Sequence, residues 1–150
     1  MDRPRLLQED YIDTPHGAWK VLVICQCLNR AQWTTVEPIL EKLFKKYPEP
    51  KSVNLVPLTF VRGCEVIDSL YELFRPLGFG LRRASNFLDM SASFLEAERA
   101  FGSNFKLYPV MSFKGCGQYA SDAWGLFVLK EERSPRDKQL KRYAERLWTK

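Results

Sequence analysis

Histidine, cysteine and long apolar runs are all scarce in this chain, and each shortage excludes a class of protein. The chain has one histidine, His16, so a zinc site with two or three histidine ligands is excluded. Its four cysteines are too scattered for a disulfide framework and form no CxxC pair, which indicates a reducing intracellular compartment. No apolar run approaches the roughly 18 residues of a membrane span. The first residues lack the apolar core of a signal peptide, so we expect a soluble protein that is not exported.

Composition and charge favour one folded domain with an anionic partner. Apolar residues make up 45% of the chain and aromatic residues 13%, which argues against disorder. A length of 150 residues suffices for one core, so we interpret residues 1–150 as a single domain. The formal charge is +5, and residues 130–150 alone hold eight Lys and Arg against four Asp and Glu. This excess indicates a polyanion as the partner.

The clearest predicted helix covers residues 34–48. Thr34 and Glu37 are spaced as a capping box, and the apolar residues that follow fall on one helical face. Pro48 ends the segment, because a proline cannot continue a helix.

Helical periodicity also dominates the rest of the chain. Three further segments have helical spacing: 65–74, 81–100 and 119–129. A last helix is predicted to open at Ser134-Pro135 and to run to Trp148. The apolar run at 19–28 fits either a buried strand or a buried helix, and an internal proline favours a connection over a strand at 52–61. The sequence therefore predicts an all-α fold.

A glycine-rich turn is one candidate for binding a phosphate group. Lys114-Gly115-Cys116-Gly117-Gln118 separates two apolar segments that we expect to be helical. Glycines let the backbone approach an anion closely, and the N–H groups that open the second helix favour negative charge. The alternative is an ordinary helix–helix turn in which the glycines only cap the helices.

Asp137 is the second candidate for chemistry. Its neighbours in the sequence are strongly basic: Arg133, Arg136, Lys138, Lys141 and Arg142. Positive charge at a helix start attracts a nucleic-acid backbone. The alternative is structural, because Ser134 and Asp137 are spaced as a capping box with Pro135 at the first helical position.

Together and in this order, the segments resemble the helix-hairpin-helix DNA glycosylases of the endonuclease III superfamily. The resemblance covers residues 6–148 and is closest to the thymine/uracil mismatch glycosylase domain of the methyl-CpG-binding glycosylases. It rests on LNR, a proline-containing helix ending in KYP, PLG, GCGQYASD, and the pattern DxxLxxYxxxLW that begins at Asp137. It implies a compact, two-lobed helical domain with the active-site cleft between the lobes.

The resemblance implies that three residues act on the base. Asp137 matches the catalytic aspartate, which must be a carboxylate to stabilise the positively charged sugar and help position water. Tyr119 matches a base-pocket residue and stands where bifunctional relatives carry a Schiff-base lysine, so weak or no lyase activity is implied. Gln8 matches a glutamine that binds the pyrimidine edge, and its amide suits thymine or uracil. Without the family, Gln8 is a solvated polar residue.

The resemblance implies further residues that contact DNA. Arg30 matches the wedge that fills the gap left by a flipped nucleotide, and Leu77 matches the residue that contacts the orphaned base from the other side. Without the family, Arg30 is a surface residue at a helix end and Leu77 an apolar helix-end contact. The residues of the glycine turn match the DNA-binding hairpin: Lys114, Gly115, Cys116, Gly117 and Gln118.

The chain departs from the family pattern around its cysteines. Cys116 stands between the glycines, where the family usually has a branched apolar residue. Many relatives follow the catalytic aspartate with four cysteines that hold an iron–sulfur cluster. No cysteine follows Cys116 here, so that cluster cannot form in that place and we expect no cofactor. Cys25 and Cys27 are interpreted as core residues.

The sequence therefore predicts a monofunctional DNA glycosylase of base excision repair. The predicted reaction flips a thymine or uracil, opposite guanine, out of double-stranded DNA and hydrolyses its N-glycosidic bond. We expect a monomer that acts away from membranes, in an intracellular compartment that contains DNA. Two alternatives stay open: a glycosylase or processing enzyme for a 5-modified pyrimidine such as 5-hydroxymethyluracil, and a non-catalytic helix-hairpin-helix DNA-binding module.

Overall fold

The computed structural model describes residues 5–53 and 63–148, and every regular element within these ranges is helical. The α-helices are α1 (Leu7–Tyr11), α2 (Gly17–Leu28), α3 (Trp33–Lys46), α4 (Glu65–Phe74), α5 (Gly80–Phe101), α6 (Gln118–Ala123) and α7 (Lys138–Trp148). Short 3-10 turns are η1 (Pro50–Val53), η2 (Arg75–Leu77), η3 (Gly102–Leu107) and η4 (Val110–Ser112), and η5 (Trp124–Val128) is a π-helical turn. The predicted all-α class is confirmed for these residues. Most of the predicted connection at 52–61 lies outside them.

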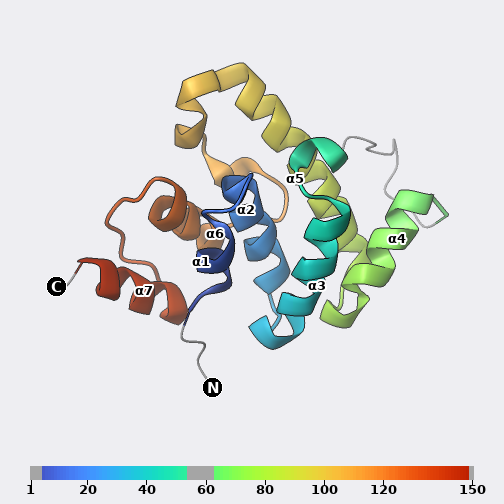
Figure 1. Cartoon of the computed structure of the whole chain (residues 1–150), viewed down its shortest axis with the longest axis horizontal. Helices are drawn as coiled ribbons and strands as arrows, with labels where there is room; N and C mark the ends of the chain where they lie inside the picture. The colour runs from blue at the N-terminus through green and yellow to red at the C-terminus, as the bar shows by residue number, and fades with distance from the viewer. Residues whose placement is uncertain (1–4, 54–62, 149–150) are drawn as a thin grey trace.

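Helix α2 forms the centre of the fold. Figure 1 shows it between α6 and α7 on one side and α3, α4 and α5 on the other. Side chains from Val21 to Cys25 are at most 3% exposed. An apolar run of this length could have formed a strand or a helix, and it is a helix because helical neighbours cover it all round.

Aromatic side chains join α2 to the helices that cover it. The indole ring of Trp19 lies 5.7 Å from the ring of Phe44 on α3 and 6.0 Å from that of Phe87 on α5. Its Nε1–H donates to Ser91 Oγ on α5 at 3.0 Å, so the one polar atom of this buried ring is satisfied. The long helix α5 is thereby fixed against the centre of the fold.

Two predicted helices begin at residues other than those that the sequence indicated. Helix α3 starts at Trp33 behind Gln32, which makes no side-chain cap, so the predicted capping box of Thr34 and Glu37 is wrong. Helix α7 starts at Lys138 and not at Ser134, because Asp137 supplies the cap. The predicted helices at 65–74 and 81–100 are confirmed to within one residue as α4 and α5.

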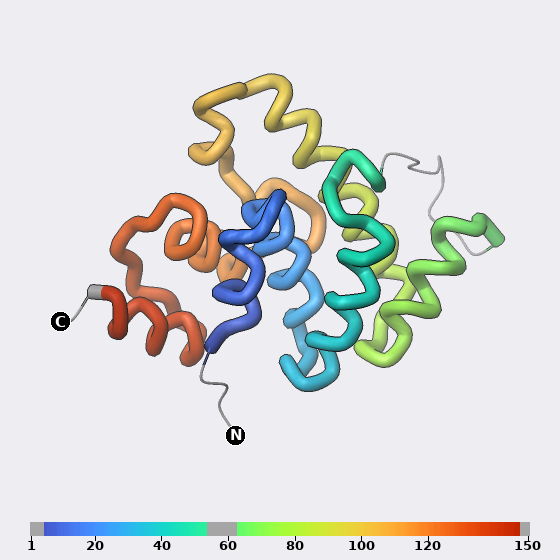
Figure 2. The backbone as a smooth tube through the Cα atoms, viewed as in Figure 1, coloured from blue at the N-terminus to red at the C-terminus, as the bar shows by residue number. Residues whose placement is uncertain are grey.

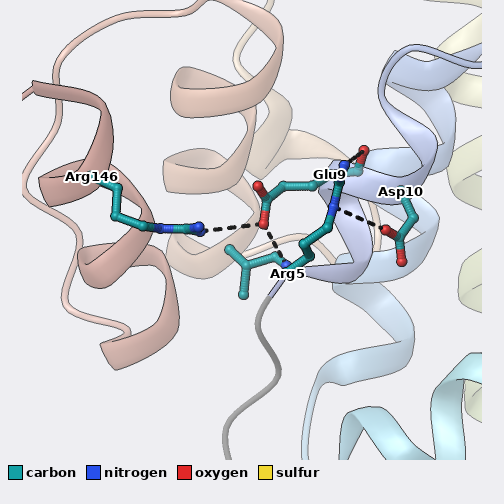
Figure 3. Close-up of polar contacts among 5 residues, drawn as sticks. Arg5, Glu9, Asp10 and Arg146 are labelled. Carbon is teal, nitrogen blue, oxygen red and sulfur yellow. Dashed lines mark hydrogen bonds and ion pairs between the residues drawn. The ribbon is translucent and has the colours of Figure 1, made fainter.

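The first and the last helix of the described chain contact each other. Figure 2 shows the segment before α1 next to the first turn of α7. Arg146 on α7 points toward Glu9 on α1, with Nη2 3.4 Å from Oε2 (Figure 3). The Glu9 side chain is only 17% exposed, so this ion pair is partly shielded from water. The contact thus joins α1 to α7.

None of the described helices is both long and apolar enough to span a bilayer.

Candidate functional site

A cleft of about 990 Å³ opens where four separate segments of the chain meet. The segments are the start of α1, the turn from α2 to α3, the glycine turn before α6, and the start of α7. Seven of the ten residues singled out in the sequence line it: Gln8, Arg30, Gly115, Gly117, Gln118, Tyr119 and Asp137. Leu77, Lys114 and Cys116 are not part of its lining. Residues up to 129 positions apart in the chain therefore meet in one place.

Asp137 is both a helix cap and part of the cleft wall. Its Oδ2 accepts the backbone N–H groups of Gln139 and Leu140, each at 3.0 Å, and so caps α7 directly. The predicted capping box, with Ser134 as the N-cap residue and Asp137 three residues later, is therefore wrong. Oδ1 has no hydrogen-bond partner among the described residues and belongs to a side chain that lines the cleft. The structural and functional interpretations of Asp137 are compatible because its carboxylate has two oxygens.

Gln8 lies at the floor of the cleft and is fully buried. Its Nε2 donates to the phenol oxygen of Tyr119 at 2.9 Å and lies 3.7 Å from Cys25 Sγ. Its Oε1 is buried without a hydrogen-bond partner among the described residues. An acceptor that stays unpaired costs about 1–3 kcal/mol of stability, and a ligand that donates to it would recover that cost. The interpretation of Gln8 as a solvated residue is wrong.

The two titratable side chains next to Gln8, those of Tyr119 and Cys25, are neutral near neutral pH. Burial raises the pKa of the Tyr119 phenol well above its usual value, and burial likewise raises that of the Cys25 thiol. Beside the cleft, burial raises the pKa of Cys116 to about 12. These groups can therefore donate or accept hydrogen bonds but cannot act as anionic nucleophiles near neutral pH. Among the described residues of the cleft, Asp137 is the one carboxylic acid.

Arg30 lines the cleft and Phe79 lines a neighbouring hollow, and we call the two turns that carry them the rim. Both have left-handed backbone conformations, with φ of 57° and 53°. Phe79 is 60% exposed although its ring is large and apolar. Both residues line a second hollow of about 220 Å³, which shares Asn29, Arg30 and Gly115 with the cleft. The two hollows therefore form one continuous surface with Arg30 between them.

Arg83 holds the two rim turns together. Its Nη2 donates to Asn29 O at 2.7 Å, and its Nε donates to Gly78 O at 2.8 Å. Its Nη1 donates to the carbonyl oxygens of Gln26 and Cys27 at 3.0 and 3.2 Å. These bonds satisfy the carbonyl groups that end α2 and fix the turn of Arg30 against that of Phe79.

Phe79 was missed by sequence reasoning, which chose Leu77 in the same turn. Leu77 is 8% exposed, packs in the core, and lines neither hollow. The sequence has a bulky residue on either side of Gly78, and no local signal tells which of the two the core accommodates. The DNA contact predicted for Leu77 stays a prediction, and Phe79 is the exposed one of the two residues.

The glycine turn has one position where glycine is required. Gly115 has φ +76°, and a Cβ there would lie 2.9 Å from Nε2 of Gln26 on α2. That same Nε2 donates to Lys114 O at 2.6 Å and so ties the turn to α2. Gly117 has open space where a side chain would be. The element before the turn is only the 3-10 turn η4, so the predicted helix there is wrong.

The remaining predicted hairpin residues differ in exposure. Lys114 and Gln118 are exposed, whereas Cys116 is buried among the core residues. Gln118 Nε2 donates to Asp122 Oδ1 at 2.9 Å. All four cysteines are free thiols. Within the described ranges, no three His, Cys, Asp or Glu side chains are grouped as a metal site would need.

Comparison with known proteins finds distant similarity over most of the chain. No protein-family profile matches the chain. The chain is similar to the methyl-CpG-binding domain protein 4-like protein of Arabidopsis thaliana, with 27% identity over 122 residues. That match covers 81% of this chain and 23% of the relative, so the chain spans about a quarter of the relative's length. The chain is thus similar to one segment of a protein named for a methyl-CpG-binding domain.

Proposed function

We propose that this chain is a helix-hairpin-helix DNA glycosylase domain that hydrolyses the N-glycosidic bond of a flipped thymine or uracil. The observation that carries the proposal is the meeting of Asp137, Tyr119 and Gln8 in one cleft, with Arg30 at its rim. The resemblance of the sequence to the helix-hairpin-helix glycosylases implies a role for each of these residues. The distant similarity to a methyl-CpG-binding domain protein 4-like protein supports the same family.

Asp137 carries the chemical step in this proposal. The bond between the sugar C1′ and the base nitrogen breaks, and its electron pair leaves with the base. The sugar then has positive character, which a carboxylate stabilises when it is held close and shielded from bulk water. Oδ2 is fixed by two N–H groups, so Oδ1 is the oxygen that faces the sugar and orients the water that adds to C1′. The proton of that water goes to the carboxylate or to solvent.

Gln8 and Tyr119 recognise the base. The unpartnered Oε1 of Gln8 accepts a hydrogen bond, and thymine and uracil offer an N3–H donor at their pairing edge. Cytosine has an acceptor at N3, so an Oε1 that faces N3 would stay unsatisfied. A buried acceptor left unpaired discriminates strongly between ligands, so this atom favours thymine and uracil. Tyr119, held by Gln8, supplies a neutral hydroxyl beside the same edge.

Arg30 and Phe79 compensate the cost of flipping. Removing a base from the stack costs a few kcal/mol, and side chains that fill the gap recover part of it. A guanidinium plane and a phenyl ring both stack on bases, and such contacts contribute about 1–3 kcal/mol per base. Both side chains line the smaller hollow beside the cleft, and we propose that they contact DNA around the flipped site.

The reaction that we propose is hydrolysis without strand cleavage. A lyase needs an amine that forms an imine with C1′, and Tyr119 stands where such a lysine would be. No lysine lines the cleft among the described residues. We therefore propose a monofunctional enzyme of base excision repair that acts as a monomer on double-stranded DNA, without a cofactor, in a compartment that contains DNA.

A base-release panel tests this function. Duplexes with a single T:G, U:G or 5-hydroxymethyluracil:G pair, and matched T:A and C:G controls, are incubated with excess protein and then treated with hot alkali. Alkali cleaves wherever a base has been lost. We expect products from the T:G or U:G duplex and none from C:G. Activity on the 5-hydroxymethyluracil duplex alone would show that the substrate is a 5-modified pyrimidine. DNA binding without any product would show that the chain is a non-catalytic DNA-binding module.

A further inference from the structure

We propose that Arg133 is a positioning residue that fixes the loop leading to Asp137 by lying against Gly125 and binding Asp122. The proposal rests on the proposed function, since it explains how the catalytic carboxylate is held. Its first support is a close approach: a Cβ at Gly125 would lie 1.8 Å from Arg133 Nε, 2.4 Å from Cδ and 2.5 Å from Cζ. The guanidinium thus occupies the space that any side chain at Gly125 would need.

The loop between η5 and α7 has few backbone anchors of its own. Its first half is held by backbone bonds, from Leu129 N–H to Trp124 O and from Glu131 N–H to Gly125 O, each at 3.0 Å. From residue 132 to Asp137 it has no regular secondary structure. Side-chain contacts therefore contribute more to fixing its second half, and Arg133 lies near the start of that half.

Ion pairs hold Arg133 in place. Its Nη2 lies 2.7 Å from Glu131 Oε1, and its Nη1 lies 3.6 Å from Asp122 Oδ1. Asp122 is 8% exposed, and a carboxylate that is this buried needs a charged or hydrogen-bonding partner. Arg133 therefore binds α6 through Asp122 and η5 through Gly125, while its own backbone belongs to the Asp137 loop.

The contact links the loop to the wall of the cleft. Asp122 Oδ1 also accepts from Gln118, which lines the cleft at the start of α6. On the other side, α7 packs on η5 through Phe127 and Tyr143, whose rings stack with centroids 4.4 Å apart. Arg133 thus completes a set of contacts that fix the start of α7 relative to the base pocket. Small displacements of a catalytic group reduce a rate strongly, so loss of this contact slows the chemical step.

Gly125→Ala tests the inference without altering any charged residue. The added methyl group displaces the Arg133 guanidinium, while alanine has the higher helix propensity, so the thermal midpoint is not expected to fall. We expect the single-turnover rate of base release to fall by roughly 10- to 100-fold. Affinity for a duplex with a non-hydrolysable nucleotide is expected to stay within about twofold, because no DNA-contacting group changes.

A double-mutant cycle supplies the matched control. Arg133→Ala alone should slow base release as Gly125→Ala does. Adding Gly125→Ala to Arg133→Ala should then change nothing further, since the guanidinium that the methyl group displaces is absent. An unchanged rate in Gly125→Ala, or losses that add in the double variant, would overturn the proposal.

A readout that needs no activity separates this proposal from the proposed function. The backbone amides of Gln139 and Leu140 donate to Asp137, and their hydrogen exchange should be faster in Gly125→Ala than in the wild type. The double variant should exchange these amides no faster than Arg133→Ala alone does. If the wild type releases no base, the proposed function fails while this exchange still tests the positioning. Unchanged exchange in Gly125→Ala, with an active wild type, contradicts the positioning alone.

Discussion

The floor and the rim of the cleft differ in burial and in backbone conformation. On the floor, Gln8 is buried and donates a hydrogen bond to the partly buried Tyr119. At the rim, Arg30 and Phe79 are exposed, and their backbones have left-handed conformations that cost about 1–2 kcal/mol each for residues other than glycine. The floor holds an unsatisfied buried acceptor and the rim holds backbone strain. Both regions thus lower the stability of the fold. In the proposed function, the floor holds polar groups that bind the base, and the rim carries two side chains that stack on DNA.

Among the floor residues, replacing the proposed catalytic carboxylate of Asp137 should reduce the rate of base release most. Asn is as good a helix cap as Asp, so Asp137→Asn should keep α7 and leave the thermal midpoint almost unchanged. The neutral amide cannot stabilise a positive sugar, so we expect base release to slow by about 100- to 1000-fold. Single-turnover kinetics and thermal unfolding of the same preparation check both statements. Full activity of Asp137→Asn would remove Asp137 from the chemistry.

Gln8→Met should separate stability from recognition on the floor. Methionine has a similar shape and removes the unpaired buried Oε1, so the free energy of unfolding should stay within about 1 kcal/mol of the wild type or increase. Loss of the hydrogen bond to the base should slow release by roughly 10- to 100-fold. Urea unfolding and single-turnover kinetics measure the two quantities. A large loss of stability with an unaltered rate would make Gln8 a structural residue.

Glycine substitutions at the rim should increase the stability of the fold and weaken DNA binding. Arg30→Gly and Phe79→Gly relieve the left-handed strain, so each should raise the free energy of unfolding by up to about 1 kcal/mol. Loss of a stacking surface should weaken binding to mismatched duplex by about tenfold. Leu77→Ala is the contrast: it should destabilise the fold by about 2 kcal/mol or more because Leu77 is in the core. If Leu77→Ala is folded and still binds DNA more weakly than Phe79→Gly, Leu77 is the residue that contacts the orphaned base.

The smallest predicted effect concerns the glycine turn. Gly117 has open space for a side chain and a negative φ, so Gly117→Asp and Gly117→Asn should both fold normally. Only the aspartate adds negative charge near a DNA phosphate, which should cost about 1 kcal/mol or roughly a fivefold loss of affinity. The difference should shrink as salt concentration rises. Equal affinities at low salt would place the DNA backbone away from this turn.

Some helices could be predicted from the sequence because their signals are local. The segments at 65–74 and 81–100 follow from apolar spacing and from the PLG sequence between them, and the structure confirms both. The run at 19–28 stayed ambiguous because a buried strand and a buried helix are equally apolar, and only the surrounding helices decide between them. Helix α1 was not predicted, since five residues are too short for a periodic pattern.

The candidate site could be predicted only as far as its sequence motifs reached. Asp137, Tyr119 and Arg30 stand in recognisable motifs, and the structure places all three on the cleft. Phe79 was missed because exposure depends on which residue of a turn the core can accommodate. The contact of Arg133 with Gly125 could not be predicted at all, because a glycine in an apolar segment does not reveal which distant side chain fills the space beside it.

Direct detection of the released base tests the central claim. Wild-type protein is incubated in excess with a U:G or T:G duplex, and free base is quantified by mass spectrometry beside the strand analysed before and after alkali. The account predicts one free uracil or thymine for each abasic site, on a strand that stays intact until alkali is added. Absence of free base, or a strand cut without alkali, would contradict hydrolysis at this cleft.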